Sequence, residues 1–258
     1  MIVAGIDVGA KNVHAVLIQD GVVLAKAAVV SGFDQEESAE RGLQEAARVA
    51  GIDRSAIQAI AATGAGRKAL AIAGQQPTEV LADGRGAAKL RPGARTVIDV
   101  GADEARAIRL SPEGKVLDFA INEKCAAGAG AFVEAMSRAL DMSLGDFATS
   151  SLGSTQSIPM NAQCTVFAES EVVSLIHANT PAADIARAVH DAMASRVSAM
   201  VRRIGVDDPV VLGGGAALNV GFVKSLSEAL GGVNVEVLPD AEYLGALGAA
   251  LIAWESAS

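Results

Sequence analysis

A short segment occurs twice in this 258-residue chain, and the repetition restricts the possible folds more than any other feature of the sequence. The segments IVAGIDVGA at 2–10 and RTVIDVGAD at 95–103 share an Ile-Asp-Val-Gly core. A single Asp-x-Gly is a common turn, but both copies lie between strand-like segments, with Asp7 and Asp99 at equivalent positions. Their separation of 92 residues is too long for a solenoid repeat. We therefore expect two similar half-molecules with one site between them.

Each copy starts a predicted meander of three antiparallel strands, because short β-branched segments alternate with polar turns. The strands are expected over 2–6, 13–18 and 22–30 in the first copy, and over 96–100, 105–110 and 115–121 in the second. Apolar periodicity and capping residues predict helices in the rest of the chain. The helices cover 35–50, 66–73, 85–90, 129–140, 165–178, 182–204, 219–230 and 242–254, with further strands at 210–212 and 234–238. This order of elements favours an α/β fold.

Three glycine-bearing turns follow predicted strands and form the candidate nucleotide site. Backbone N–H groups at Gly9 and Gly101 can face a phosphate, and the preceding Asp7 and Asp99 can hold Mg²⁺ through water. The run GGGAA at 213–217 has almost no side chains, so a flat adenosine can pack on its backbone. The sequence has no Walker loop and no G-x-G-x-x-G motif at the start of a βαβ unit. The prediction of a nucleotide site therefore depends on the ordered set of two acidic hairpins followed by the glycine run. The candidate catalytic residues are Asp7 and Asp99, and the candidate nucleotide-binding residues are Gly9, Ala10, Lys11, Asn12, Gly101, Ala102, Asp103, Gly213, Gly214, Gly215 and Ala216.

This ordered set resembles the nucleotide site of the superfamily that contains actin, the sugar kinases and Hsp70. The resemblance implies an α/β fold of duplicated actin-like (RNase H-like) ATPase domains, with ATP between the halves and a hairpin from each half on its phosphates. We expect residues 1–94 to form the first subdomain, with the C-terminal helix 242–258 packing back on it. Residues 95–241 would form the second subdomain and carry both cysteines.

The two cysteines of the chain both stand directly before predicted helices. Cys125 lies in NEKCAAGAG and Cys164 in QCTVFAESE. A helix N-terminus favours a thiolate, and equally an anionic thiolate-ligated iron–sulfur cluster. The alternative interpretation is that both are small buried apolar residues, as free cysteines often are. The sequence has no CxxC pair, so it does not indicate a zinc site. Two cysteines are half of the four that ligate an iron–sulfur cluster, and a twofold dimer would supply the other half.

Longer motifs resemble one ATPase family, BadF/BadG/BcrA/BcrD, which comprises the activators of 2-hydroxyacyl-CoA dehydratases and the ATPase subunits of benzoyl-CoA reductase. The matching segments are GIDVGA, ATGAGRKAL, NEKCAAGAGAFVEAM, QCTVFAESEVVSLI, VLGGGAALNVGFV and LPDAEYLGALGAAL. The resemblance implies that Cys125 and Cys164 of each subunit bind one [4Fe–4S] cluster shared across a dimer. ATP with Mg²⁺ would drive low-potential electrons from reduced ferredoxin or flavodoxin to a CoA-thioester reductase or dehydratase. The dimer would be a homodimer or a heterodimer with a paralogous ATPase subunit.

Some residues depart from the activators of that family. Asp103 and Glu104 stand where the activators usually have Gln and Asp, and Ala10 replaces the usual Ser or Thr. The form D-x-G-A followed by R-A-I-R looks more like the D-type subunit of benzoyl-CoA reductase, which is therefore the expected relative. An activator of a 2-hydroxyacyl-CoA dehydratase is the alternative. A sugar or carboxylate kinase without a cluster, and a nucleotide-sensing scaffold, are alternatives of other classes.

Composition excludes several partners. The formal net charge is −9 and only 3% of residues are aromatic, so a general nucleic-acid binder is not expected. The apolar uncharged stretch 209–223 is too short to span a membrane, and Asp7 interrupts the apolar N-terminus, which lacks the basic region of a signal peptide. We therefore expect a cytoplasmic protein with reduced thiols. His14, His177 and His190 are interpreted as structural, because none has a ligand-like spacing to a cysteine.

Overall fold

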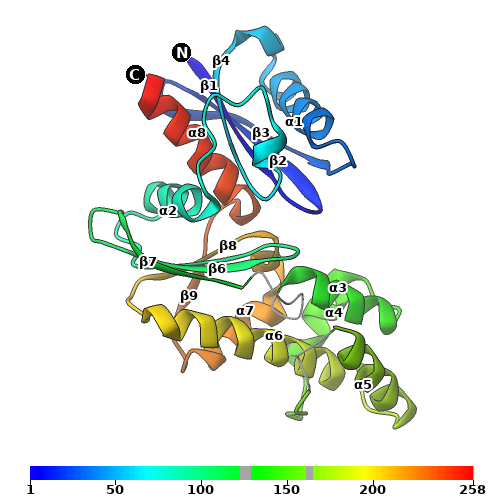
Figure 1. The fold of residues 1–258 in the computed structure, drawn as a ribbon. Helices are drawn as coiled ribbons and strands as arrows, with labels where there is room; N and C mark the ends of the chain where they lie inside the picture. Colours follow the sequence, from blue (N-terminus) through cyan, green and yellow to red (C-terminus); the bar gives the residue numbers. More distant parts are fainter. Residues whose placement is uncertain (123–128, 161–164, 258) are drawn as a thin grey trace.

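Two sheets of the same basic topology form the frame of the protein, in a computed structural model that describes residues 1–122, 129–160 and 165–257 (Figure 1). The first sheet has the order β3-β2-β1-β4, with β1 at Ile2–Val8, β2 at Asn12–Gln19, β3 at Val22–Val30 and β4 at Ile57–Thr63. The second has the order β7-β6-β5-β8-β9, with β5 at Thr96–Val100, β6 at Ala105–Leu110, β7 at Val116–Asn122, β8 at Val210–Gly213 and β9 at Val235–Val237. In each, an antiparallel meander is extended by a parallel strand beside its first strand, β4 or β8.

Helices cover both faces of the first sheet (Figure 1). On one face, α1 at Gln35–Ala50 packs Leu43 into a core that includes Ile6. On the other, α8 at Leu244–Ala257 packs against a core that includes Val3. Successive strand residues point to opposite faces, so the nearly continuous apolar run of β1 serves both cores.

The helices of the second half pack around one large apolar core built on the second sheet. They are α3 at Gly130–Ala139, α4 at Leu144–Ser150, α5 at Thr165–His177, α6 at Ala182–Ile204 and α7 at Val220–Ala229. The long helix α6 contacts β6, β7, α3 and α7 and so forms the centre of this layer. Within the described ranges, no helix combines the length and apolar character needed to cross a bilayer.

One helix, α2 at Glu79–Leu90, packs against both halves. It contacts α8, which lies on the first sheet, and also β5, β6, β7 and β8 of the second sheet. The Thr78 side chain caps its N-terminus by accepting a hydrogen bond from the Leu81 N–H at 3.3 Å. Because α2 touches α8 of the first half and the strands of the second sheet, its polar residues are placed close to any site between the halves.

Several predicted elements differ from the structure. The helix expected over 66–73 is a three-residue 3₁₀ turn, Arg67–Ala69, because this segment follows β4 and is held against the end of β1, where the Gly66 N–H donates to the Val8 carbonyl. The segment 85–90 is the C-terminal half of α2. The last helix begins at Leu244, after a 3₁₀ turn at Ala241–Tyr243. Strand β4 and helix α4 were not predicted, whereas both meanders, α1 and α6 are confirmed.

Candidate functional site

Two hairpins with the same backbone hydrogen bond carry the predicted phosphate-binding residues. Between β1 and β2, the Gly9 N–H donates to the Asn12 carbonyl at 3.1 Å. Between β5 and β6, the Gly101 N–H donates to the Glu104 carbonyl at 2.9 Å. The residues between these glycines and their partners are Ala10 and Lys11 in the first hairpin and Ala102 and Asp103 in the second. The repeat in the sequence is therefore also a repeat of turn geometry.

A glycine in the left-handed conformation follows the parallel strand beside each hairpin. Gly64 follows β4 with φ +88°, and Gly214 follows β8 with φ +81°. A Cβ on Gly64 would lie 2.4 Å from Oδ1 of Asp7, and one on Gly214 would lie 2.3 Å from the carbonyl oxygen of Val100. Only glycine allows the backbone to approach both hairpins this closely.

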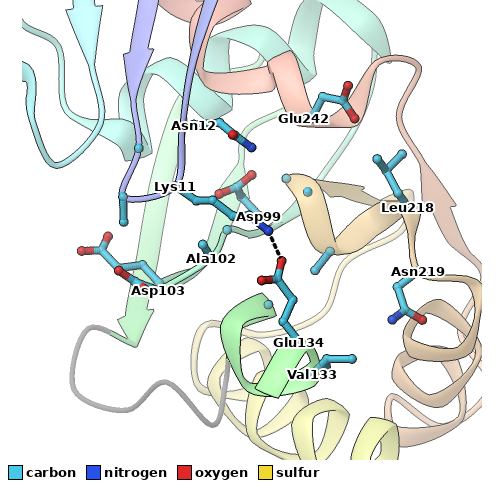
Figure 2. Close-up of a pocket in the computed structure, with 18 of the residues that line it drawn as sticks. Lys11, Asn12, Asp99, Ala102, Asp103, Val133, Glu134, Leu218, Asn219 and Glu242 are labelled. Atoms are coloured by element: carbon cyan, nitrogen blue, oxygen red, sulfur yellow. Dashed lines mark hydrogen bonds and ion pairs between the residues drawn. The ribbon is translucent and has the colours of Figure 1, made fainter. Parts of the chain in front are cut away.

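A cavity of about 630 Å³ lies between the hairpins, within the usual range of roughly 300–1,000 Å³ for ligand pockets. Figure 2 shows side chains from both halves around it. All but one of the predicted catalytic and nucleotide-binding residues line it, namely Asp7, Gly9, Ala10, Lys11, Asn12, Asp99, Gly101, Ala102, Asp103, Gly214, Gly215 and Ala216. The exception is Gly213, where a Cβ would lie 2.3 Å from Cδ2 of Leu244, so this glycine accommodates α8.

A buried arginine connects the second hairpin to α2. The Arg106 guanidinium donates to Oδ2 of Asp83 at 3.0 Å, to Oδ2 of Asp99 at 2.8 Å and to Oε2 of Glu104 at 3.1 Å. Asp83 is 2% exposed and Asp99 is 4% exposed, so this is a buried network of charges. It fixes the orientation of Asp99 at the cavity wall and attaches the hairpin to the helix that packs against both halves.

Asp7, the equivalent carboxylate of the first hairpin, has a different electrostatic environment. Its pKa is raised to about 6: burial is the largest cause, the Arg106 charge opposes the rise, and the negative charges of Asp99, Glu79 and Glu104 add to it. The pKa of Arg106 itself is raised, because Asp83 and Asp99 more than offset the effect of its burial. Asp7 is therefore a carboxylate whose charge changes close to neutral pH.

An ion pair crosses the cavity from the first hairpin to the second half. The Lys11 ammonium donates to Oε1 of Glu134, which lies on α3 (Figure 2). The Lys11 side chain is 54% exposed and the Glu134 side chain 26% exposed, so the pair is open to solvent and to ligands. Lys11 is the predicted phosphate-binding lysine, and in this structure its partner is a carboxylate.

Another part of the cavity is mainly apolar and contains one ordered amide. Its apolar lining consists of Val133, Leu144, Ala148, Met193, Leu218 and Phe222. Oδ1 of Asn219 accepts the Phe222 N–H at 2.9 Å, which identifies its Nδ2 as the atom 3.0 Å from Nε2 of His190. Burial and the Arg187 charge lower the pKa of His190 to about 4, so the imidazole is neutral and its Nε2 accepts this bond.

This apolar region suits a nucleobase. A flat heterocycle buries its faces against apolar side chains and needs only a few polar contacts at its edges. The second Nδ2 hydrogen of Asn219 is available for such a contact, since the first is directed at His190. The charged hairpins and the apolar region thus match the two chemically different ends of a nucleotide.

The predicted cluster ligands, Cys125 and Cys164, lie outside the described residues. The described chain ends at Asn122 before the first and resumes with Ala129, immediately before α3. After the second it resumes at Thr165, the first residue of α5. Their ligand role therefore stays a prediction.

Asp83, Glu134 and Asn219 were not predicted from the sequence. They lie in helices or at a helix start, where an isolated polar residue is usually exposed. Arg106 had a detectable signal within the repeat. It follows Asp99 by the same seven residues that separate His14 from Asp7, and in both hairpins these residues face each other across the strand pair.

Comparison with known families matches residues 4–253 to the BadF/BadG/BcrA/BcrD ATPase family. The chain belongs to this family. It is 38% identical over 257 residues to the activator of lactoyl-CoA dehydratase from Anaerotignum propionicum, covering 100% of this chain and 99% of that protein. It is 33% identical over 263 residues to the D-type subunit of benzoyl-CoA reductase from Thauera aromatica, covering 97% and 92%. The predicted family is confirmed, but the expected similarity to the D-type subunit is not supported, because the activator is the more similar relative.

Solved structures of this ATPase family have the same fold. The crystal structure of component A of the (R)-2-hydroxyglutaryl-CoA dehydratase from Acidaminococcus fermentans matches with a TM-score of 0.94 at 36% identity, covering 100% of this chain and 99% of that one. The activator of the 2-hydroxyisocaproyl-CoA dehydratase from Clostridium difficile, with bound ADPNP, gives 0.94 at 33% identity, covering 100% and 96%. A ROK hexokinase from Thermus thermophilus gives 0.52 at 19% identity over 100% of both chains, which shows a common fold alone. The predicted actin-like α/β fold is confirmed.

Proposed function

We propose that this family member hydrolyses ATP to drive electrons into a CoA-thioester dehydratase of the 2-hydroxyacyl type, as its activator. One observation supports this most strongly: the two repeated hairpins and the glycine turn after β8 line one cavity with a charged and an apolar region. That is the arrangement expected for ATP held between two related halves. The sequence identity to dehydratase activators supports the choice of acceptor.

The hairpin residues would act on the phosphates. The N–H groups near Gly9 and Gly101 would donate to phosphate oxygens, and Asp7 and Asp99 would orient Mg²⁺ and the attacking water. Within the described part of the chain, no three Asp, Glu, His or Cys side chains gather as a ready metal site. This fits Mg²⁺, which commonly uses one or two carboxylates, several waters and the substrate phosphates. The residues present therefore suit a metal that arrives with the nucleotide.

The adenosine would lie on the backbone of Gly214, Gly215 and Ala216, with the base in the apolar region beside Asn219. The buried, neutral His190 would keep the Asn219 amide in one orientation. These groups bind and orient the nucleotide and take no part in the transfer of the phosphoryl group.

The redox part of the proposal rests on the family resemblance of the cysteine segments. Cys125 and Cys164 of two subunits would bind one [4Fe–4S] cluster, which when bound supplies a one-electron carrier. Reduced ferredoxin or flavodoxin would be the donor, and the partner subunit would be a second copy or a paralogue. We place the protein in the cytoplasm, where these thiols would remain reduced.

Anaerobic purification tests the proposal directly. We expect a brown protein with about four iron atoms per dimer, which loses its iron in Cys125→Ser and Cys164→Ser. We also expect ATP-dependent reduction of an added 2-hydroxyacyl-CoA dehydratase. A colourless protein with full ATP binding and sugar-dependent release of ADP would contradict the proposal and favour a kinase.

A further inference from the structure

The helix α3 contacts both hairpins of the cavity, by two different kinds of bond. The Gly130 N–H donates to the Gly101 carbonyl at 2.8 Å, and the Ala131 N–H donates to the Ala102 carbonyl at 2.9 Å. These two backbone bonds fix the start of α3 to the second hairpin. The first hairpin reaches the same helix through the ion pair of Lys11 with Glu134.

The ion pair is the weaker of these two connections. Both of its side chains are partly exposed and both line the cavity, and such pairs are easily exchanged for another partner. A lysine ammonium is a compact charge with three donors, and a terminal phosphate offers it more negative charge than one carboxylate. Nucleotide phosphates entering between the hairpins would therefore compete with Glu134 for Lys11.

Glu134 has a second cation available once it loses Lys11. Nη1 of Arg138, one helical turn further along α3, lies 4.0 Å from Oε2 of Glu134. The carboxylate is therefore not left without a counter-charge when Lys11 moves. The exchange exposes no buried charge, which favours a reversible event.

We propose that Glu134 is a positioning residue for nucleotide binding: it holds Lys11 in the nucleotide-free protein and yields it to the terminal phosphate of ATP. This inference rests on the proposed ATP site. Nucleotide binding then breaks the link between the first hairpin and α3 while the backbone bonds to the second hairpin persist. Glu134 thereby lowers the affinity for ATP and makes the attachment of α3 dependent on the nucleotide.

A double-mutant cycle tests this assignment, with ADPNP and ADP titrated calorimetrically into the full chain under anaerobic conditions. Glu134→Gln should tighten ADPNP binding by about two- to fivefold, the value of an exposed ion pair, and should tighten ADP binding less. In the Lys11→Gln background, Glu134→Gln should have no effect, because it acts through Lys11. Lys11→Arg, which keeps the charge, should preserve the response.

Glu242→Gln is the matched control, because Glu242 lines the same cavity and its removal changes the charge equally. Its effect on ADPNP binding should be the same with and without Lys11. An unchanged ADPNP affinity in Glu134→Gln, or an equal shift in the Lys11→Gln background, overturns the inference and leaves the ATP site intact. A wild-type protein that does not bind ADPNP overturns the proposed function itself, and this inference with it.

Discussion

In the first hairpin Asp7 lies opposite His14 across the strand pair, and in the second Asp99 lies opposite Arg106. The turn bonds and the adjacent glycines are equivalent in the two hairpins. The side chains that face the two aspartates differ in charge. Burial lowers the pKa of His14, so a neutral imidazole faces Asp7, whereas a permanent cation faces Asp99.

This difference shows how a duplicated backbone places its two aspartates in different electrostatic environments. Asp99 is bonded to Arg106 and through it to α2, so its position is fixed by a network. Asp7 has no ion pair with another described residue, and its pKa of about 6 leaves its charge responsive to pH and to a metal. One half therefore provides a carboxylate held by an ion pair, and the other a carboxylate whose charge can change.

Removing the cation of the second hairpin should have the largest effect. In Arg106→Met, Asp83 and Asp99 remain buried without their partner, so we expect the free energy of unfolding to fall by about 3–5 kcal/mol. Urea denaturation measures the loss. Adding Asp83→Asn to Arg106→Met should restore part of it, because one of the two buried charges is then removed.

Arg85 provides the control for this prediction. It pairs with Glu255 at the surface, with side chains 35% and 41% exposed. Arg85→Met should therefore cost less than about 1 kcal/mol. Equal losses for Arg85→Met and Arg106→Met would show that the buried network has no special role in the second half.

The carboxylate whose charge can change, Asp7, should dominate the chemistry. We expect Asp7→Asn to slow ATP hydrolysis by about 100-fold or more, the typical effect of removing a group that handles a proton or orients the nucleophile. In the wild type, kcat/KM for ATP should rise as the pH passes about 6, the pKa of Asp7 in the free protein. Asp99→Asn should also slow the reaction and keep a pH step, moved to lower pH because the Asp99 charge contributes to the raised pKa of Asp7. A step that survives in Asp7→Asn would disprove the assignment.

Asp7 should also make the stability of the folded protein decrease as the pH rises. Its pKa is raised from 3.8 to about 6 in the folded protein, so folding favours the protonated form. The stability from this group is therefore complete below pH 3.8 and is lost as the pH rises through 6. Asp7→Asn should have a higher melting temperature than the wild type at pH 8, and the difference should disappear near pH 4, as differential scanning fluorimetry would show.

The two adjacent glycines test whether the backbones of the halves are equally constrained. Gly51 also has a positive φ, of 68°, but a Cβ there would meet nothing within 4 Å. Gly51→Ala should therefore cost only the conformational strain, about 1–2 kcal/mol. Gly64→Ala and Gly214→Ala add an overlap with backbone atoms and should each cost about 1 kcal/mol more. Thermal unfolding of the three variants measures these costs. If either Gly64→Ala or Gly214→Ala cost no more than Gly51→Ala, the backbones of the two halves would not be equally constrained.

The repeat was sufficient to predict the hairpins, because β-branched strands and Asp-x-Gly turns are local features of the sequence. It did not predict β4, although β4 completes the first sheet beside β1. The segment IQAIAAT is rich in alanine, which has a weak preference for strands. It forms a strand because Ala61 and Ala62 are fully buried there, a tertiary effect that no local pattern contains.

The buried network of Arg106 could not be predicted from the sequence for a similar reason. Asp83 lies in α2, of which only the second half was predicted, and its partner Arg106 comes from a strand 23 residues later. The chemistry of such a pair depends on two elements packing side by side. Lys11 was predicted to bind phosphate from its hairpin, yet its present partner Glu134 is 123 residues away.

The tips of the hairpins should give the smallest effect. Lys11 and Asp103 occupy equivalent positions, four residues after Asp7 and Asp99, and they carry opposite charges. Asp103 is exposed, so its repulsion of a nucleotide would be weakened by solvent. We expect Asp103→Asn to tighten ADPNP binding by no more than about fivefold, measured by calorimetry, with the gain shrinking in 0.5 M salt as the Debye length falls to about 4 Å. Asp118→Asn, an exposed carboxylate on β7 outside the cavity, should change nothing. Weaker binding in Asp103→Asn would mean that Asp103 contributes to holding the phosphates or their Mg²⁺, and that both hairpins act through their tips.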